Sequence, residues 1–289
     1  MKKILLMLLM LSLTLSLLAA CGGSNAPVDN GGAVGDGNTN GGQTGGEDVA
    51  TPPAPLKEAK LFYELTADGE GYIVVQNSEP NAVTATVPAM YEGKPVVAIG
   101  DGVFQKCTSL MSVSLPDSIV SIGDSAFGGC ESLISFALPR GLKSVGTLAF
   151  YGCYNLANFT VPEQLEVIGS DAFDGTAYYN KTANWEKGVL YLGKYLVSAR
   201  PNVTECAVKE GTVSIAGSAF NSCASLASVS IPASVTHIGV GAFFSCTALT
   251  EIRYAGTSEA WENTVNKEMY WDMETGEYTV ICSDTSSAK

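Results

Sequence analysis

The sequence predicts a repeat solenoid, because one unit recurs with a period of 23 residues. Within the unit, a phenylalanine and a short apolar pattern typical of a β-strand stand at fixed positions. The unit reads Ile-Gly-x-x-Ala-Phe-x-x-Cys-x-x-Leu-x-x-Val-x-Ile-Pro, and its copies open at Ile99, Ile122, Val145, Ile168, Ile215 and Ile238. Each copy is too small to bury its own apolar face, so the copies are expected to stack around one continuous core. The product is an extended surface, and such surfaces bind more often than they catalyse.

Residues 1–21 are predicted to be a targeting segment. Lys2 and Lys3 form a basic start, and the apolar run 4–18 is too short to be a membrane-spanning helix. The run ends in Leu-Ala-Ala-Cys at Cys21, which resembles the lipobox of bacterial lipoproteins. That resemblance implies a lipid on Cys21 that holds the mature chain to the extracellular face of a bacterial membrane, as its only membrane contact. The alternative is an ordinary secretory signal cleaved near Ala20.

Residues 22–56 are predicted to be a disordered linker rich in Gly, Asn and Pro. A flexible coil of this length reaches about 30 Å, enough to hold a domain clear of the lipid headgroups. A match to a calcium-binding loop between Asp36 and Glu47 is attributed to low complexity, because glycine and proline flank it instead of helices.

The repeat array is expected over residues 99–254, between an N-terminal cap at 57–98 and a C-terminal cap at 255–289. The spacing Leu110-x-x-Val113-x-Leu115 is that of a leucine-rich-repeat strand, so one short parallel strand is predicted per repeat. The same spacing recurs from Leu133, Leu156, Leu226 and Leu249. Proline follows the strands at Pro116, Pro139, Pro162 and Pro232, where it ends the ladder.

The Gly-x-x-Ala-Phe segment is predicted to form short helical turns on the side opposite the strands. Its aromatic position is expected to build a column of stacked rings from Phe104, Phe127, Phe150, Phe173, Phe220 and Phe243. The neighbouring alanines are small enough for the turns to close over the rings.

An insert at about 177–202 interrupts the array. Ile168 and Ile215 are 47 positions apart, 24 more than one repeat. Within the insert, the run from Val189 to Val197 predicts a hairpin that turns at Gly193-Lys194. The insert is rich in aromatic side chains, namely Tyr178, Tyr179, Trp185, Tyr191 and Tyr195. They are interpreted as packing against the array or, alternatively, as anchors for a partner.

These features together resemble the BspA-type leucine-rich repeats of bacterial surface proteins. The resemblance covers nearly all of the chain from about Leu61 to Cys282. The stretch 87–96 looks like the entry cap of that family, and Tyr254 to Trp261 looks like its exit cap. Two positions depart from the pattern, with Ala216 for glycine and Thr176 for cysteine. The resemblance implies a right-handed β/α superhelix and a role in adhesion to host or neighbouring cells.

Catalytic and metal chemistry find little support in the sequence. The repeat cysteines Cys107, Cys130, Cys153, Cys223 and Cys246 are interpreted as a reduced ladder of small core side chains, with disulfides between coils as the alternative. There is no Cys-x-x-Cys pair, and the single histidine, His237, is interpreted as a surface variation at a position that elsewhere holds serine. The chain is therefore predicted to be no enzyme and to bind neither metal nor cofactor.

Charge argues against nucleic acid as a partner. Without Lys2 and Lys3, 14 basic side chains face 29 acidic ones, so the formal charge falls from −13 to −15.

The expected binding surface is the outward face of the strands, together with the insert aromatics. The candidate ligand-binding residues are Asn158, Thr160, Tyr178, Tyr179, Trp185, Ser228, Ser230, Glu251 and Arg253. The predicted function is a non-catalytic, cell-surface, monomeric protein that binds an extracellular protein partner. The alternatives are a module for carbohydrate or cell-envelope glycan and a passive structural spacer.

Overall fold

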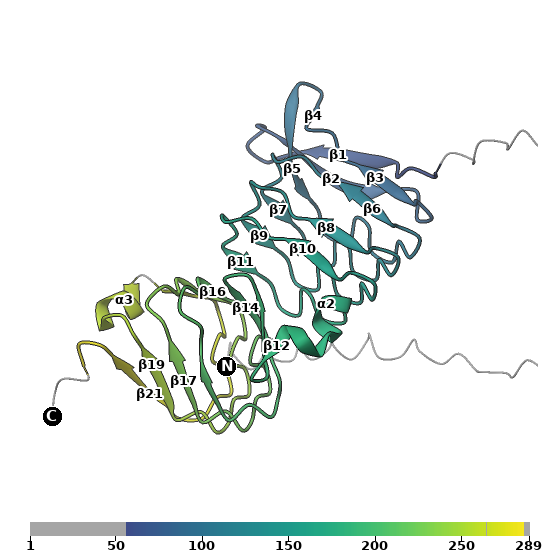
Figure 1. Cartoon of the computed structure of the whole chain (residues 1–289). Helices are drawn as coiled ribbons and strands as arrows, with labels where there is room; N and C mark the ends of the chain where they lie inside the picture. The colour runs from purple at the N-terminus through teal and green to yellow at the C-terminus, as the bar shows by residue number, and fades with distance from the viewer. Residues whose placement is uncertain (1–55, 264, 286–289) are drawn as a thin grey trace, which may run out of the picture. The chain divides into compact units, whose positions relative to one another are not determined.

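A computed structural model describes residues 56–263 and 265–285 (Figure 1). The predicted targeting segment with Cys21, and the predicted linker up to residue 55, lie outside the described residues. Within the described part of the chain, no helix is long and apolar enough to cross a membrane.

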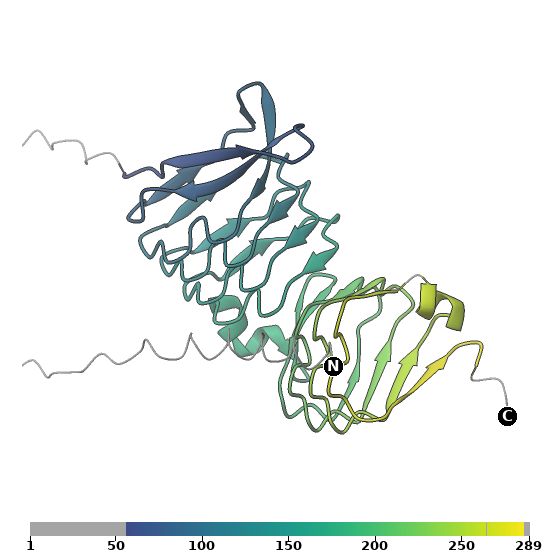
Figure 2. The same cartoon turned by 180° about the vertical axis from the view of Figure 1, so that it is seen from behind.

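Short strands form one face of a solenoid. The strands predicted from the leucine spacing are β6 (Ser112–Ser114), β8 (Ser135–Ala137), β10 (Asn158–Thr160), β17 (Ser228–Ile231) and β19 (Glu251–Tyr254). The same face also contains β3 (Thr84–Thr86), β15 (Glu205–Ala207) and β21 (Thr279–Cys282), which were not predicted. All pairs on this face are parallel, β3 with β6, β8 with β10, and β15-β17-β19-β21 as one sheet. Strands of successive coils lie side by side in both views (Figure 1 and Figure 2). The predicted repeat solenoid is confirmed.

A second parallel ladder, which the sequence analysis did not predict, runs along the isoleucine position of each repeat. It is divided between two sheets. One contains β5 (Lys94–Ile99), β7 (Ser121–Ile122), β9 (Ser144–Val145) and β11 (Val167–Ile168), and the other contains β14 (Tyr195–Ala199), β16 (Ser214–Ile215), β18 (His237–Ile238) and β20 (Asn266–Lys267). In the regular copies other than the one at Ile215, a glycine follows this position and lets successive coils approach closely. A Cβ atom added at Gly146 would lie only 2.6 Å from the backbone nitrogen of Asp124 in the preceding coil.

The Gly-x-x-Ala-Phe segments form hydrogen-bonded turns where helical turns were expected. Residues at two positions of each turn adopt positive φ, as at Ser125 (53°) and Gly129 (75°), and a helix cannot continue through them. Their backbone groups are satisfied by the next coil instead. The amide of Phe127, for example, donates to the carbonyl oxygen of Ala149 at 2.8 Å. The expected helical turns were therefore wrong in detail, because stacking between coils competes with local helix.

The predicted stacking of phenylalanine rings is confirmed, but the single column of six was wrong: Phe104 to Phe173 form one stack and Phe220 with Phe243 another, in two different core clusters. The centroid of Phe127 lies 5.0 Å from that of Phe104 and 5.4 Å from that of Phe150, with nearly parallel planes. Phe220 and Phe243 stack in the same way at 4.9 Å. These five rings are fully buried, so each stack lies inside one of the two core clusters.

The predicted hairpin of the insert is confirmed, and it is built into the second ladder. The insert begins with α2 (Ala177–Asn180), the 3-10 turn η1 (Thr182–Asn184) and β12 (Trp185–Glu186). Next, β13 (Val189–Leu192) pairs antiparallel with β14, which pairs parallel with β16. Alternate side chains of β13 enter two core clusters, with Leu190 and Leu192 in one and Val189 and Tyr191 in the other. The insert thus joins two stacks of coils.

Short elements cover the two ends of the array. At the N-terminal end, β1 (Leu61–Leu65) pairs antiparallel with β2 (Tyr72–Asn77), and β2 pairs parallel with β5. The strand β4 (Met90–Tyr91) forms an antiparallel hairpin with β5. At the C-terminal end, α3 (Ser258–Asn263) places Trp261 against Tyr254 and Trp271, and Trp261 is buried.

Candidate functional site

The repeat cysteines are core side chains without a free thiolate. All seven described cysteines are buried and unpaired, so the disulfide alternative is not realised in this structure. The thiols of Cys130 and Cys153 donate to the carbonyl oxygens of Phe104 and Phe127, each at 3.1 Å, in the preceding coil. Burial raises the pKa of the Cys153 thiol to about 12. Such thiols are poor nucleophiles at neutral pH.

The prediction that His237 is a surface variation was wrong. The side chain lies on β18 and is only 9% exposed. Its Nδ1 accepts a hydrogen bond from Asn266 Nδ2 at 3.3 Å, and its Nε2 lies 2.9 Å from Glu268 Oε1. The carboxylate and the amide come from the C-terminal cap, which no local pattern around His237 reveals.

A serine lies next to this histidine but is not activated by it. Ser214 pairs in register with His237, is 1% exposed, and has a hydroxyl with no hydrogen-bond partner among the described residues. Because both ring nitrogens of His237 are engaged elsewhere, the ring is not available as a base for Ser214. Within the residues that the structure describes, no cluster of His, Cys, Asp or Glu is arranged to hold a metal ion.

Two acidic side chains that were not predicted as a site, Asp171 and Asp174, lie on the turn just before the insert. Burial raises the pKa of Asp174 to about 6; the nearby charge of Asp171 adds to this, and a hydrogen bond with Tyr179 opposes it. Burial also raises the pKa of Asp171.

Replacing Asp174 by asparagine is expected to stabilise the protein at neutral pH. Because the folded-state pKa lies above the ordinary value of 3.8, the stabilisation from protonated Asp174 is complete below about pH 4 and is lost as the pH rises through about 6. Asp174→Asn should raise the free energy of unfolding by about 1 kcal/mol at neutral pH, and by much less near pH 4. Urea denaturation at the two pH values measures both differences, and equal differences would contradict the assignment.

Four of the candidates, on β17 and β19, lie on the face of the sheet β15-β17-β19-β21. The strand register aligns two rows across this sheet. One row contains Glu205, Ser228, Glu251 and Thr279, and the other contains Ala207, Ser230, Arg253 and Ile281. The sequence analysis placed Ser228, Ser230, Glu251 and Arg253 on one surface, and the structure brings them together there. It missed β15 and β21, because neither strand stands in a regular copy of the repeat.

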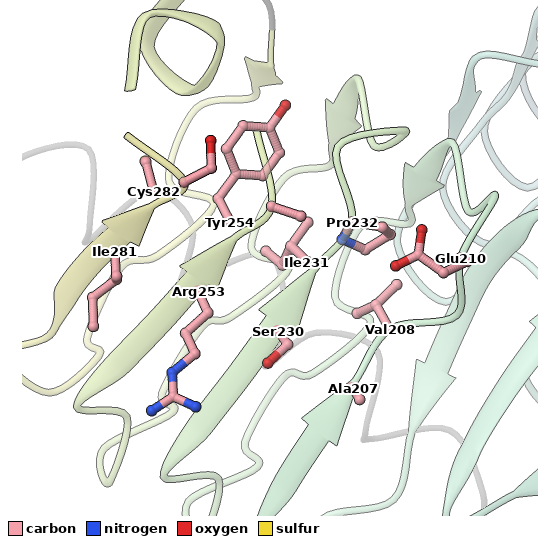
Figure 3. A pocket seen from close by; sticks show the side chains of 12 residues that line it. Ala207, Val208, Glu210, Ser230, Ile231, Pro232, Arg253, Tyr254, Ile281 and Cys282 are labelled. Carbon is pink, nitrogen blue, oxygen red and sulfur yellow. The ribbon is translucent and has the colours of Figure 1, made fainter. Parts of the chain in front are cut away.

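Two adjoining grooves mark this face, and both are lined by Ala207, Ser230 and Arg253. The first, of about 310 Å³, runs past the carboxyl ends of the strands, where Figure 3 shows Val208, Pro232 and Tyr254 beside it. The second, of about 440 Å³, extends to the insert. The first is mainly apolar and the second carries charged side chains, so one ligand could contact both kinds of surface.

Two ion pairs lie at the second groove. The Arg253 guanidinium Nε lies 2.6 Å from Glu251 Oε1. Lys209 forms an ion pair with Glu186, and its ammonium nitrogen lies 4.5 Å from the ring centroid of Tyr191. These pairs hold long side chains in place before any ligand arrives, which reduces the entropy lost on binding.

The remaining candidate residues lie elsewhere. Asn158 and Thr160 are exposed on β10, which belongs to a different sheet from β17 and β19.

The aromatic candidates of the insert are partly buried and hydrogen-bonded. The Tyr178 hydroxyl donates to the Tyr191 carbonyl oxygen at 2.6 Å, and Trp185 Nε1 donates to the Tyr179 carbonyl oxygen, also at 2.6 Å. The Arg200 guanidinium lies 4.2 Å from the Trp185 ring centroid. These contacts favour the packing interpretation of the insert aromatics over the anchor interpretation.

A stacked array of parallel strands with an open, grooved face defines the chain as a leucine-rich-repeat solenoid. Residues 93–203 and 179–269 match the family described as BspA type leucine rich repeat region, in six copies. The chain belongs to this family, as the resemblance in the repeat pattern predicted. No curated protein matches the chain.

Solved structures of bacterial leucine-rich-repeat proteins are similar to this chain. A leucine-rich-repeat protein of T. pallidum is 31% identical, over 66% of this chain and 78% of that one, with a TM-score of 0.43. A leucine-rich-repeat protein of Bacteroides ovatus is 17% identical, over 78% and 76%, with a TM-score of 0.40. A leucine-rich cell surface protein of Faecalibacterium prausnitzii is 20% identical, over 76% and 94%, with a TM-score of 0.30.

Proposed function

We propose that this chain is a monomeric, non-catalytic adhesion protein of the bacterial surface, and that it binds an extracellular protein through the face of β15-β17-β19-β21. The observation that carries the proposal is the pair of adjoining grooves that share Ser230 and Arg253. An apolar groove beside an ordered arginine is the kind of surface in which protein partners place their anchoring side chains.

The binding test uses a substitution that fills the grooves and leaves the core unchanged. Full-length protein is applied to an array of purified extracellular matrix proteins, and affinity for each captured protein is measured in solution. Ser230→Trp places a large side chain between the two grooves and should weaken binding by at least about tenfold. The matched control is Ser114→Trp, because Ser114 is also exposed and occupies the same repeat position on β6. Equal affinities for the two variants would contradict the proposed face, and a wild-type protein that binds no array member would contradict the proposed function.

The location at the surface is proposed to depend on a lipid at Cys21. Cys21→Ala should abolish acylation, so that the protein appears in the soluble fraction or remains unprocessed. Intact-mass analysis of the mature wild-type protein should show an acylated terminal cysteine, with membrane fractionation as the second measurement. A soluble, unmodified wild-type product that begins at another residue would exclude the lipid anchor.

A further inference from the structure

Two exposed tyrosines stand on the turns of the third regular coil. Tyr151 is 51% exposed and Tyr154 is 58% exposed. In the preceding coil the same repeat positions hold Gly128 and Glu131, so the aromatic pair is a local feature of one coil. Neither tyrosine is needed in the core, because Phe150 and Cys153 beside them are fully buried.

A column of glycines lies between the two tyrosine positions. Gly129, Gly152 and Gly175 occupy one repeat position in successive coils, and all have positive φ. A Cβ atom at Gly152 would lie 3.8 Å from the Cζ and hydroxyl oxygen of Tyr154, and one at Gly175 would lie 3.8 Å from its Cε1. The Tyr154 ring therefore extends along two coils over bare backbone. Because glycine has no side chain, the ring can lie flat against the backbone at these positions. We call the exposed surface of the Tyr154 ring the platform.

The polar groups around this platform have unused hydrogen-bonding capacity. Within residues 56–263 and 265–285, neither tyrosine hydroxyl has a hydrogen-bond partner, and Glu131 has no ion-pair partner. The side-chain nitrogen of Asn155 donates to the Glu131 carbonyl oxygen at 2.7 Å, which orients the amide and leaves its oxygen available as an acceptor. Donors and acceptors thus surround an exposed aromatic surface.

We propose that Tyr151 and Tyr154 form a binding site for a polysaccharide chain. A hexose ring has an apolar C–H face that packs on an aromatic ring, and hydroxyl groups at its edge that need both donors and acceptors. Tyr154 supplies the ring, and Asn155, Glu131 and the tyrosine hydroxyls supply the hydrogen-bonding groups. Because the Tyr154 ring lies over Gly152 and Gly175 of two successive coils, it offers a chain of sugars an apolar surface that is not confined to one coil.

The shape of the site favours a polysaccharide over a protein. Protein anchors bind best in concave, fully desolvated pockets, and neither tyrosine lines the grooves on the β15-β17-β19-β21 face. The site also lies on the turns of the first stack of coils, away from Ser230 and Arg253, and does not depend on the function proposed for that face.

Affinity electrophoresis of the full-length protein tests the site, in native gels that contain soluble mixed-linkage glucan, mannan, galactan or peptidoglycan fragments. At least one of these should retard the wild-type protein. Tyr154→Ala and Tyr151→Ala should each raise the dissociation constant about tenfold or more, whereas Tyr154→Phe should keep most of the affinity because it keeps the ring.

Two controls make the result decisive. Ser230→Trp should leave polysaccharide binding unchanged. The alanine variants should have the melting temperature of the wild-type protein, because both tyrosine side chains are exposed. The proposal is overturned if no polysaccharide retards the wild-type protein, or if the Tyr151→Ala, Tyr154→Ala double variant binds as wild type does. It is also overturned if these substitutions weaken capture on the protein array and leave polysaccharide binding unaffected.

Discussion

Replacing Phe150 by alanine is expected to lower the free energy of unfolding by about 3–5 kcal/mol, the usual cost of deleting a buried aromatic side chain. The ring is fully buried and stacks between Phe127 at 5.4 Å and Phe173 at 5.5 Å. Phe136 and Phe159 contact it edge to face from the strand side. Its removal opens a cavity between coils that cannot close, because backbone hydrogen bonds fix the coil spacing on two sides.

Chemical denaturation of the wild-type protein and the variant measures the loss. Tyr151→Ala is the matched control, since it deletes an aromatic ring one position along the chain that is 51% exposed, and it should change stability by less than about 0.5 kcal/mol. A comparable loss in both variants would mean that the buried and exposed faces of the turn are wrongly assigned.

The second large effect is expected from one methyl group. Gly146→Ala should destabilise the protein by about 3 kcal/mol or more, or prevent its folding, because the added Cβ atom would lie 2.6 Å from the backbone of Asp124 and Gly123. These neighbours are main-chain atoms of the preceding coil, so no side-chain rotation relieves the contact. The array can accept the methyl group only by separating two coils.

Gly211→Ala is the appropriate comparison, measured by thermal and urea unfolding. Gly211 has a φ of 79° and nothing within 4 Å of an added Cβ atom, so alanine there adds backbone strain without a clash. That strain should cost about 1–2 kcal/mol. If Gly146→Ala cost no more than Gly211→Ala, close contact between coils would not be the reason for glycine at this position.

The one regular copy with alanine at this position supports the same physical reason. Ala216 follows β16, and the strand before β16 is β14 of the hairpin instead of a regular coil. The Ala216 amide donates to the Leu196 carbonyl oxygen at 2.8 Å, so Leu196 stands where a regular coil has its isoleucine. After Leu196 the chain continues along β14, whereas a regular coil continues into a glycine turn. The alanine at position 216 thus coincides with a local change in how the coils stack.

Features that depend on a local period were predictable from the amino-acid sequence. The 23-residue repeat indicated the solenoid, the leucine spacing located strands of one face, and the recurring phenylalanine predicted the stacked rings. Alternation and Gly193 located the hairpin. Each of these follows from which side chains a short segment must bury, and that information is contained in the segment.

Contacts between neighbouring coils could not be predicted from the sequence and became known from the structure. Hydrogen bonds between coils replaced helical turns with turns of positive φ and added a second ladder at the isoleucines. The buried setting of His237 comes from Glu268 and Asn266, 31 and 29 residues further along the chain. The grooves around Ser230 and Arg253 need β15 and β21 on either side of the regular strands, and the Tyr154 platform needs a glycine from the next coil. These features arise from pairs of segments brought together by stacking, so no single segment specifies them.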